Sequence, residues 1–227
     1  MPATVLSSAR LALRAPPIMP LEPSERAIVY VVDDDASMRS ALQELFNSVG
    51  LESRAYATAR DFLATNLADR PGCIILDVRL PDMNGLDFQT RLTELGIYLP
   101  VVMMTGHGNI PMSVRAMKRG AVDFLSKPFH DQDMLDAVMT AIERDRGRRT
   151  VEGDIAQMRQ RFDTLSPRER QVMLIVTTGK MNKQVAGDLG ISEITVKIHR
   201  SAAMRKMGAR TLADLIRMAE VVKRTHP

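Results

Sequence analysis

The chain lacks any long apolar run, and it contains a single cysteine among its 227 residues. No stretch approaches the roughly 18 consecutive apolar residues that a membrane-spanning helix requires, so we expect no membrane span. One cysteine cannot form an intramolecular disulfide, which favours the reducing cytoplasm as the place of action. We expect Cys73 to be a small buried residue at the start of a strand. The hydrophobic fraction of 45% and charged fraction of 26% are those of an ordinary globular protein.

Residues 1–26 are poor in acidic residues, contain five prolines and lack an apolar run long enough for a secretory signal. We interpret them as a disordered N-terminal extension. Because the first expected strand begins only at Ala27, the alternative is that Met19 is the true initiator.

Charge is distributed unevenly along the chain. The formal net charge is +4, but residues 27–146 carry −5 and residues 147–227 carry +8. The acidic part suggests a site for a cation or for phosphate chemistry, and the basic part suggests a polyanion as partner.

Short apolar runs alternate with helical patterns from Ala27 to Asp145. Five such alternations predict a doubly wound α/β domain with a five-stranded parallel sheet covered by helices on both faces. The strands are expected at 28–32, around 54–56, and at 74–76, 101–104 and 122–125, and the helices near 36–49, 58–66, 84–95, 109–119 and 131–145.

The pattern becomes all-helical beyond Asp145. Residues 146–162 form one helical stripe, but Gly147 and Gly153 each weaken a helix by about 1 kcal/mol relative to alanine, so we expect a hinge-prone helical linker. The segment Ser166-Pro167-Arg168-Glu169 then predicts a capped helix start. Further helices are expected at roughly 182–189, 192–207 and 211–222, which makes residues 163–227 a four-helix domain.

Two expected strands end in acidic residues, at Asp33-Asp34-Asp35 and at Asp77. The carboxyl ends of parallel strands meet at one edge of the sheet, so these carboxylates should lie close together and repel one another unless a cation is bound. Hard oxygen ligands at a water-accessible site suit Mg²⁺ better than zinc.

The next two strands end near Thr105 and Lys127. A carboxylate, a divalent metal, a hydroxyl and an ammonium group at one edge could stabilise a phosphoryl group during transfer. Asp77 would be the nucleophile that forms an acyl phosphate.

In the basic part, a helix, a turn at Gly190 and a second helix from Ser192 have the outline of a helix-turn-helix. On a helical wheel Val196, Ala203 and Met207 form the expected core face, and Ile194, Ile198, Ser201 and Arg205 lie opposite. Two isoleucines on an exposed face suit a DNA major groove, where they can contact thymine methyl groups; a packed partner helix is the alternative. The expected phosphate contacts are Lys183, Arg200, Arg205 and Lys206.

Residues 27–145 resemble the receiver domain of two-component response regulators in four motifs: VVDDDAS, ILDVRLPDMNG, VVMMTGHG and FLSKPF. The resemblance implies that Mg²⁺ is bound by Asp34, Asp77 and the backbone carbonyl of Arg79, with Asp33 acting through water.

The same resemblance implies that Asp77 accepts a phosphoryl group from the phosphohistidine of a sensor histidine kinase. Thr105 and Lys127 would contact the bound phosphate, and Phe124 would be the switch aromatic that changes rotamer as Thr105 moves. The Lys127-Pro128 peptide bond would be cis.

The segment LSPRERQV, followed by NKQVAGDLGISEITVKIHRSAAMRKMG, resembles the LuxR/NarL-type DNA-binding domain, and the whole chain is most similar to FixJ-type regulators. This implies base contacts by Lys197, Ile198 and Ser201, although Ser201 stands where some relatives have a basic residue. It also implies a DNA-bound dimer formed by the last helix. The full expected DNA-binding set is Lys183, Thr195, Lys197, Ile198, Arg200, Ser201 and Arg205.

The combined prediction is a cytoplasmic transcriptional regulator, not an enzyme, that forms a homodimer on phosphorylation and binds double-stranded promoter DNA. RNA polymerase is a further candidate partner. Two alternatives stay open: an enzyme that turns over an aspartyl phosphate, and a protein whose basic domain binds RNA or another protein.

Overall fold

The computed structural model describes residues 26–106 and 108–225, and its contacts divide the chain into two compact units, residues 1–138 and 139–227. Except for Arg26, the expected N-terminal extension lies outside the described residues, as does the alternative initiator Met19. Among the described residues, no helix is both long enough and apolar enough to cross a membrane.

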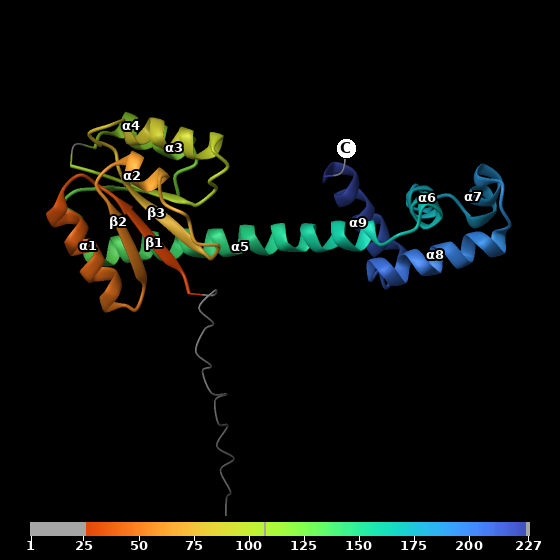
Figure 1. Cartoon of the computed structure of the whole chain (residues 1–227). Coiled ribbons are helices and arrows are strands. Elements are labelled where there is room, and N and C mark those ends of the chain that lie inside the picture. Colours follow the sequence, from red (N-terminus) through yellow and green to blue (C-terminus); the bar gives the residue numbers. More distant parts are fainter. Residues whose placement is uncertain (1–25, 107, 226–227) are drawn as a thin grey trace, which may run out of the picture. The chain divides into compact units, whose positions relative to one another are not determined.

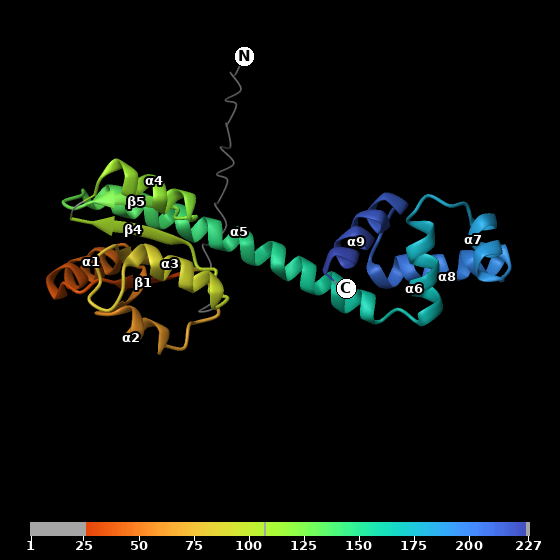
Figure 2. The ribbon, with the colours of Figure 1, turned by 90° about the horizontal axis from the view of Figure 1, so that it is seen from above.

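The first unit contains a five-stranded parallel sheet in the order β2-β1-β3-β4-β5, which confirms the predicted doubly wound α/β fold. In Figure 2, β4 lies between β5 and β1, in keeping with this order. The strands are β1 (Ile28–Val32), β2 (Glu52–Tyr56), β3 (Gly72–Asp77), β4 (Val101–Thr105) and β5 (Asp123–Ser126).

Helices cover both faces of the sheet. In Figure 1, α2, α3 and α4 lie on one face and α1 lies on the other. Every residue of β1 and β3 is buried, because helices cover both faces of these central strands, and their sequences are therefore mainly continuous apolar runs. Cys73 is buried within β3, as predicted. The helices are α1 (Ala36–Ser48), α2 (Ala59–Leu63), α3 (Gly85–Glu94) and α4 (Ile110–Lys118).

The helix α5 runs unbroken over Asp131–Asp163, so the helix expected at 131–145 and the expected linker helix are one element. It stays helical through Gly147 and Gly153, the two residues that predicted a hinge-prone linker. Ion pairs one turn apart span Gly147: Asp145 accepts from Arg148 at 2.6 Å and from Arg149 at 2.8 Å. Such pairs stabilise helical backbone and oppose the helix-weakening effect of glycine.

The rest of the second unit is helical, as predicted. The capping box is present at the start of α6: the Ser166 backbone N–H donates to Glu169 at 2.7 Å, and the Glu169 N–H donates to Ser166 Oγ at 3.3 Å. Gly190 separates α7 from α8 with φ of 62°, a conformation that favours glycine. The helices are α6 (Pro167–Val176), α7 (Asn182–Leu189), α8 (Glu193–Met207) and α9 (Leu212–Thr225).

Candidate functional site

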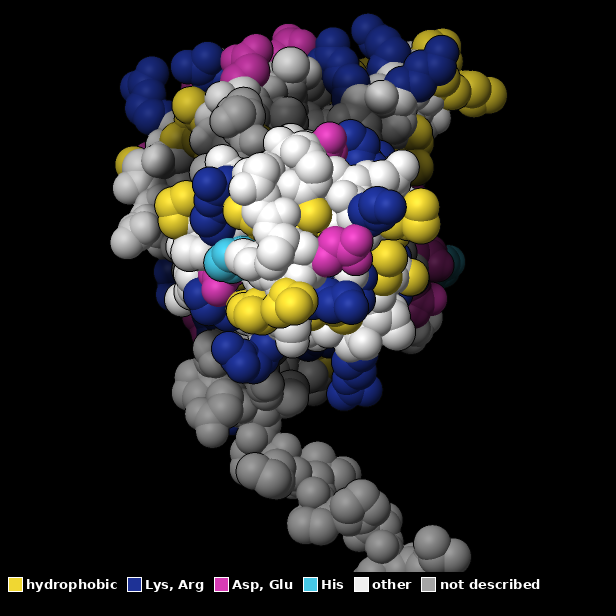
Figure 3. Space-filling view, turned by 90° about the vertical axis from the view of Figure 1, so that its right-hand side faces the viewer, with side chains coloured by type: hydrophobic (Ala, Val, Ile, Leu, Met, Phe, Trp, Pro, Cys, Tyr) yellow, Lys and Arg dark blue, Asp and Glu magenta, His cyan; other side chains and the backbone are white. Residues whose placement is uncertain are grey.

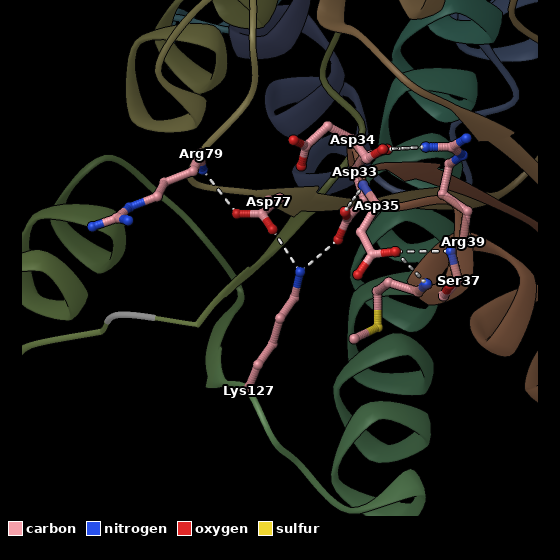
Figure 4. A network of polar contacts seen from close by, with 9 residues as sticks. Asp33, Asp34, Asp35, Ser37, Arg39, Asp77, Arg79 and Lys127 are labelled. Carbon is pink, nitrogen blue, oxygen red and sulfur yellow. Dashed lines mark hydrogen bonds and ion pairs between the residues drawn. The ribbon is translucent and has the colours of Figure 1, made fainter.

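The strands β1 and β3 are hydrogen-bonded neighbours, with Val32 opposite Leu76, so the acidic residues that follow them meet at one edge of the sheet. One carboxylate oxygen from each of Asp33, Asp34 and Asp77 lies within 4.8 Å of the other two. We call these three carboxylates the acidic rim (Figure 4). Clustered carboxylate oxygens are the donors that Mg²⁺ prefers, so the rim fits the cation that the sequence predicted.

Lys127 neutralises part of the acidic rim. Its Nζ lies 2.6 Å from Asp33 Oδ2 and 2.5 Å from Asp77 Oδ2 (Figure 4). Burial raises the pKa of Asp33, and the hydrogen bond from Lys127 only partly opposes this effect. Burial also disfavours the charged form of Lys127, but hydrogen bonds to Asp33 and Asp77 outweigh it, so the pKa of Lys127 is raised. The lysine is therefore held protonated between the two carboxylates.

The loop after β3 fixes the orientation of Asp77. The Arg79 N–H donates to Asp77 Oδ1 at 2.8 Å, and Arg79 forms an isolated antiparallel bridge with Asn84, the N-cap of α3. In Figure 4 the Arg79 side chain points away from Asp77. Asp77 is thus held from two sides, by Arg79 at Oδ1 and by Lys127 at Oδ2.

Thr105 and Phe124 lie on the adjoining strands. Thr105 ends β4, is 1% exposed and pairs in register with Ser126 of β5, while its carbonyl accepts from the Lys127 N–H at 2.8 Å. The Lys127-Pro128 bond is cis, as predicted. Phe124 is partly buried beside a hollow of about 360 Å³. The hollow is lined by Gly108, Asn109, Ile110, Ser113, Phe124 and Ser126.

Three residues near the acidic rim were missed by the sequence analysis. Asp82 accepts from the backbone N–H groups of Ala59 and Arg60 at 3.3 and 3.0 Å, and so ties the loop after Asp77 to the start of α2. Gly85 packs against the backbone of Asp77. Arg39 bonds to the backbone beside the rim. All three contact backbone atoms, which every residue carries, so the Pro-Asp-Met-Asn-Gly turn is the one signal that the sequence offers for them.

A second candidate site lies on α8. As the wheel predicted, Val196, Ala203 and Met207 are fully buried, and Ile194 and Ile198 are 71% and 61% exposed. In Figure 3, Lys and Arg side chains lie among hydrophobic ones on the face that is turned toward the viewer. A shallow hollow of about 390 Å³ follows the exposed face of α8 and is lined by Ile194, Lys197, Ile198, Ser201, Ala202 and Arg205.

Some of the expected DNA contacts are engaged within the domain. Lys206 Nζ lies 2.7 Å from the Glu169 carboxylate, so this lysine forms an ion pair within the domain. Arg200 donates to Asn182 Oδ1 at 3.1 Å and thereby links α8 to α7. The Thr195 hydroxyl lies 2.8 Å from Ser192 Oγ at the start of α8.

Both units match known protein families. The model of the response regulator receiver domain matches residues 29–139, and that of the bacterial regulatory proteins of the luxR family matches residues 163–219. The chain therefore belongs to the response regulators of two-component systems that join a receiver domain to a LuxR-type DNA-binding domain, and it is a transcriptional regulator.

Among individual relatives, Nodulation protein W of Bradyrhizobium diazoefficiens is 58% identical over 201 residues, which are 88% of each chain. Transcriptional regulatory protein FixJ of Rhizobium meliloti is 41% identical over 84% of this chain and 94% of its own. The solved structure of response regulator StyR superposes with a TM-score of 0.76 at 43% identity, covering 86% of this chain and 98% of that one. The predicted FixJ-type family is thereby confirmed.

Proposed function

We propose that Asp77 is the phosphoacceptor of this regulator and that its phosphorylation controls the binding of promoter DNA. The observation that supports this most directly is the position of its carboxylate. It ends a central strand, is 6% exposed, is held at one oxygen by the Arg79 N–H and at the other by Lys127, and lies in a rim with Asp33 and Asp34. An oriented carboxylate beside an ammonium group is suited to attack phosphorus and to tolerate the resulting charge.

In the proposed reaction, a carboxylate oxygen of Asp77 forms a bond to phosphorus as the phosphorus–nitrogen bond to a histidine of a sensor kinase breaks. The imidazole leaves with the bonding electron pair. The Lys127 ammonium and the Thr105 hydroxyl would contact the equatorial oxygens of the phosphoryl group.

The rim would hold Mg²⁺ through Asp34, Asp77 and the Arg79 carbonyl, with Asp33 acting through water. When bound, this cation supplies positive charge that neutralises phosphoryl oxygens. The protein's own part is to orient Asp77 and to keep Lys127 protonated beside it.

Phosphorylation would control dimerisation through a conformational change around Thr105 and Phe124. Phosphate contact by Thr105 would shift Phe124, and the surface of α4 and β5, about residues 110–125, would then pair with a second copy. On DNA, α8 would enter the major groove and α9 would pair with the α9 of a second copy. The regulator would act in the cytoplasm, with RNA polymerase as a further candidate partner.

The test is transfer of radioactive phosphate from a cognate kinase to full-length protein. We expect the isosteric change Asp77→Asn to abolish labelling and to leave the circular dichroism spectrum unchanged. Asp61→Asn, at an exposed carboxylate on α2, serves as the control and should label normally. Undiminished labelling of Asp77→Asn would refute the assignment.

A further inference from the structure

Arg39 lies near the start of α1, beside the acidic rim (Figure 4). Its Nη1 atom donates to the backbone carbonyl of Asp33 at 2.8 Å and to that of Asp34 at 2.9 Å. A cation near the N-terminus of a helix is placed unfavourably, because the helix dipole is positive at that end. The side chain is held there by the two carbonyls, which suggests a role beyond helix formation.

The bonds made by Arg39 fix the backbone on both sides of Asp34. The peptide group before Asp34 is held through the Asp33 carbonyl, and the peptide group after it is held through the Asp34 carbonyl. The second peptide group is also held through the Asp35 N–H, which donates to Asp33 Oδ1 at 2.8 Å. With both flanking peptide groups fixed, the direction of the Cα–Cβ bond of Asp34 is fixed as well, which limits where its carboxylate can lie.

The carboxylate of Asp34 differs from the other two of the rim. Asp33 and Asp77 both bond to Lys127. The Asp34 carboxylate is exposed and has no hydrogen-bond or ion-pair partner within residues 26–106 and 108–225. Its backbone is thus constrained while both carboxylate oxygens are available to a ligand.

We propose that Arg39 is a positioning residue that holds Asp34 in the orientation in which its carboxylate binds a divalent cation. This rests on the proposed function, which makes the acidic rim the metal site. The two possible roles of Arg39, positioning Asp34 and adding positive charge, have opposite effects on Mg²⁺ binding. If Arg39 acted only through its positive charge, its removal would strengthen Mg²⁺ binding by relieving repulsion; if it positions Asp34, its removal weakens binding.

The experiment is a calorimetric titration of full-length, unphosphorylated protein with Mg²⁺. We expect Arg39→Met to weaken Mg²⁺ binding by about tenfold, the lower end of the usual effect of residues that orient a metal ligand. Arg39→Lys, which keeps a donor and the charge, should recover part of the loss. Unchanged or tighter binding by Arg39→Met overturns the proposal.

Two controls sharpen this result. Arg91→Met removes an exposed arginine of α3 that pairs only with Glu94 in the described structure, and it should leave the Mg²⁺ affinity unchanged. In an Asp34→Asn background, Arg39→Met should have no further effect, because the group that it positions is gone; an undiminished further loss would contradict positioning through Asp34.

The outcomes separate this inference from the proposed function. If Asp34→Asn binds Mg²⁺ as tightly as the unaltered chain, the rim is not the metal site and both fail. If Asp34→Asn binds weakly and Arg39→Met binds normally, only the role of Arg39 fails. Circular dichroism checks the fold. Should Arg39→Met not fold, Arg39→Lys replaces it with a smaller weakening expected, and an unchanged or tighter affinity again counts against the proposal.

Discussion

Gly85 illustrates, at the scale of single residues, how closely the backbone approaches at the acidic rim. A Cβ atom added at this position would lie 2.3 Å from the backbone oxygen of Asp77 and 2.9 Å from Cα of Val78. Backbone atoms cannot move aside as a flexible side chain can. The start of α3 and the end of β3 therefore fit together only if residue 85 has no side chain.

We expect Gly85→Ala to lower the free energy of unfolding of the receiver unit by about 1–3 kcal/mol, the usual cost of inserting a methyl group into a packed site. The displaced Asp77 backbone should also slow phosphorylation. Urea unfolding followed by tyrosine fluorescence measures the first effect, because all three tyrosines lie in the first unit. Gly106→Ala is the control, since a Cβ there meets nothing within 4 Å; an equal loss in both variants would contradict the explanation.

Glu169 combines two stabilising contacts in the DNA-binding unit. It accepts from the Ser166 N–H in the capping box and pairs with Lys206 at 2.7 Å. The hydrogen bond from Lys206, followed by that from Ser166, lowers the pKa of Glu169 below its usual value of 4.5. A carboxylate with a lowered pKa in the folded state stabilises the fold above its unfolded pKa, and this contribution is lost as the pH falls through the folded value.

We therefore expect Glu169→Gln to lower the free energy of unfolding by about 0.5–1 kcal/mol at pH 7, because glutamine can keep the capping box but loses the ion pair with Lys206. The difference in the free energy of unfolding between the variant and the unaltered chain should shrink once the pH falls below 4.5. Urea unfolding monitored at 222 nm, with the receiver transition assigned by tyrosine fluorescence, provides the measurement. Glu220→Gln, at an exposed residue of α9, should show no such pH-dependent difference. A constant difference at all pH values would mean that the charge of Glu169 contributes nothing.

At the scale of elements, α8 presents an apolar strip toward the proposed DNA groove. Ile194 and Ile198 lie one turn apart, are both mostly exposed, and border the same shallow hollow as Lys197. Contact between an exposed isoleucine and a thymine methyl group removes both from water and stabilises the protein–DNA complex. The strip therefore predicts thymines in the half-site that α8 contacts.

Replacing those thymines by deoxyuridine deletes one methyl group each. We expect about a fourfold loss of affinity for a contacted thymine, equivalent to about 0.8 kcal/mol of lost burial. Ile198→Ala should bind more weakly and should no longer distinguish thymine from uracil at the contacted position. Binding to an operator found by genome-wide mapping is measured by fluorescence anisotropy. Val151→Ala, an exposed apolar residue of α5, should retain the full discrimination.

The elements themselves could largely be predicted from the sequence, for a physical reason. Strands buried on both faces, such as β1 and β3, appear as continuous apolar runs, and the Ser-Pro-Arg-Glu cap marks the start of α6. The edge strand β2 is buried on fewer sides and gave a weak signal, and α2 ends at Leu63, three residues earlier than expected.

The acidic rim could be predicted only in part. Its carboxylates follow apolar runs, so the sheet topology brings them together. The contributions of Arg39 and Asp82 could not be predicted, because both side chains bond to backbone groups, which every residue carries and which leave no specific signal in the sequence. Likewise, the ion pair between Lys206 and Glu169 joins residues 37 positions apart, and a helical wheel cannot show it.

At the scale of the whole molecule, charge is separated between the two parts of the chain, with −5 over residues 27–146 and +8 over residues 147–227. A basic domain that contacts DNA phosphates releases counterions, so its affinity falls as salt increases. We expect Lys183→Ala, an exposed lysine in the first turn of α7, to reduce the slope of log affinity against log salt by about 0.9.

The matched control removes the same charge from the acidic part. Arg60→Ala, at an exposed arginine of α2 outside the proposed dimer surface, should leave the salt slope unchanged although the net charge falls equally. Equal changes in both variants would show that overall charge, and not a phosphate contact by Lys183, determines the salt dependence. The slopes are obtained with one DNA duplex over a series of salt concentrations.

The ion pairs of Lys127 join residues that are far apart in the chain, 94 positions from Asp33 and 50 from Asp77. During synthesis, therefore, the two aspartates leave the ribosome well before the lysine that joins them. Until β5 has been made and placed beside β4, the carboxylates have no ammonium group between them. Under the proposed function, the receiver can therefore accept a phosphoryl group only after Lys127 has been made, and a chain that stops short of β5 has the aspartates but lacks the pairing that holds Asp77 in place.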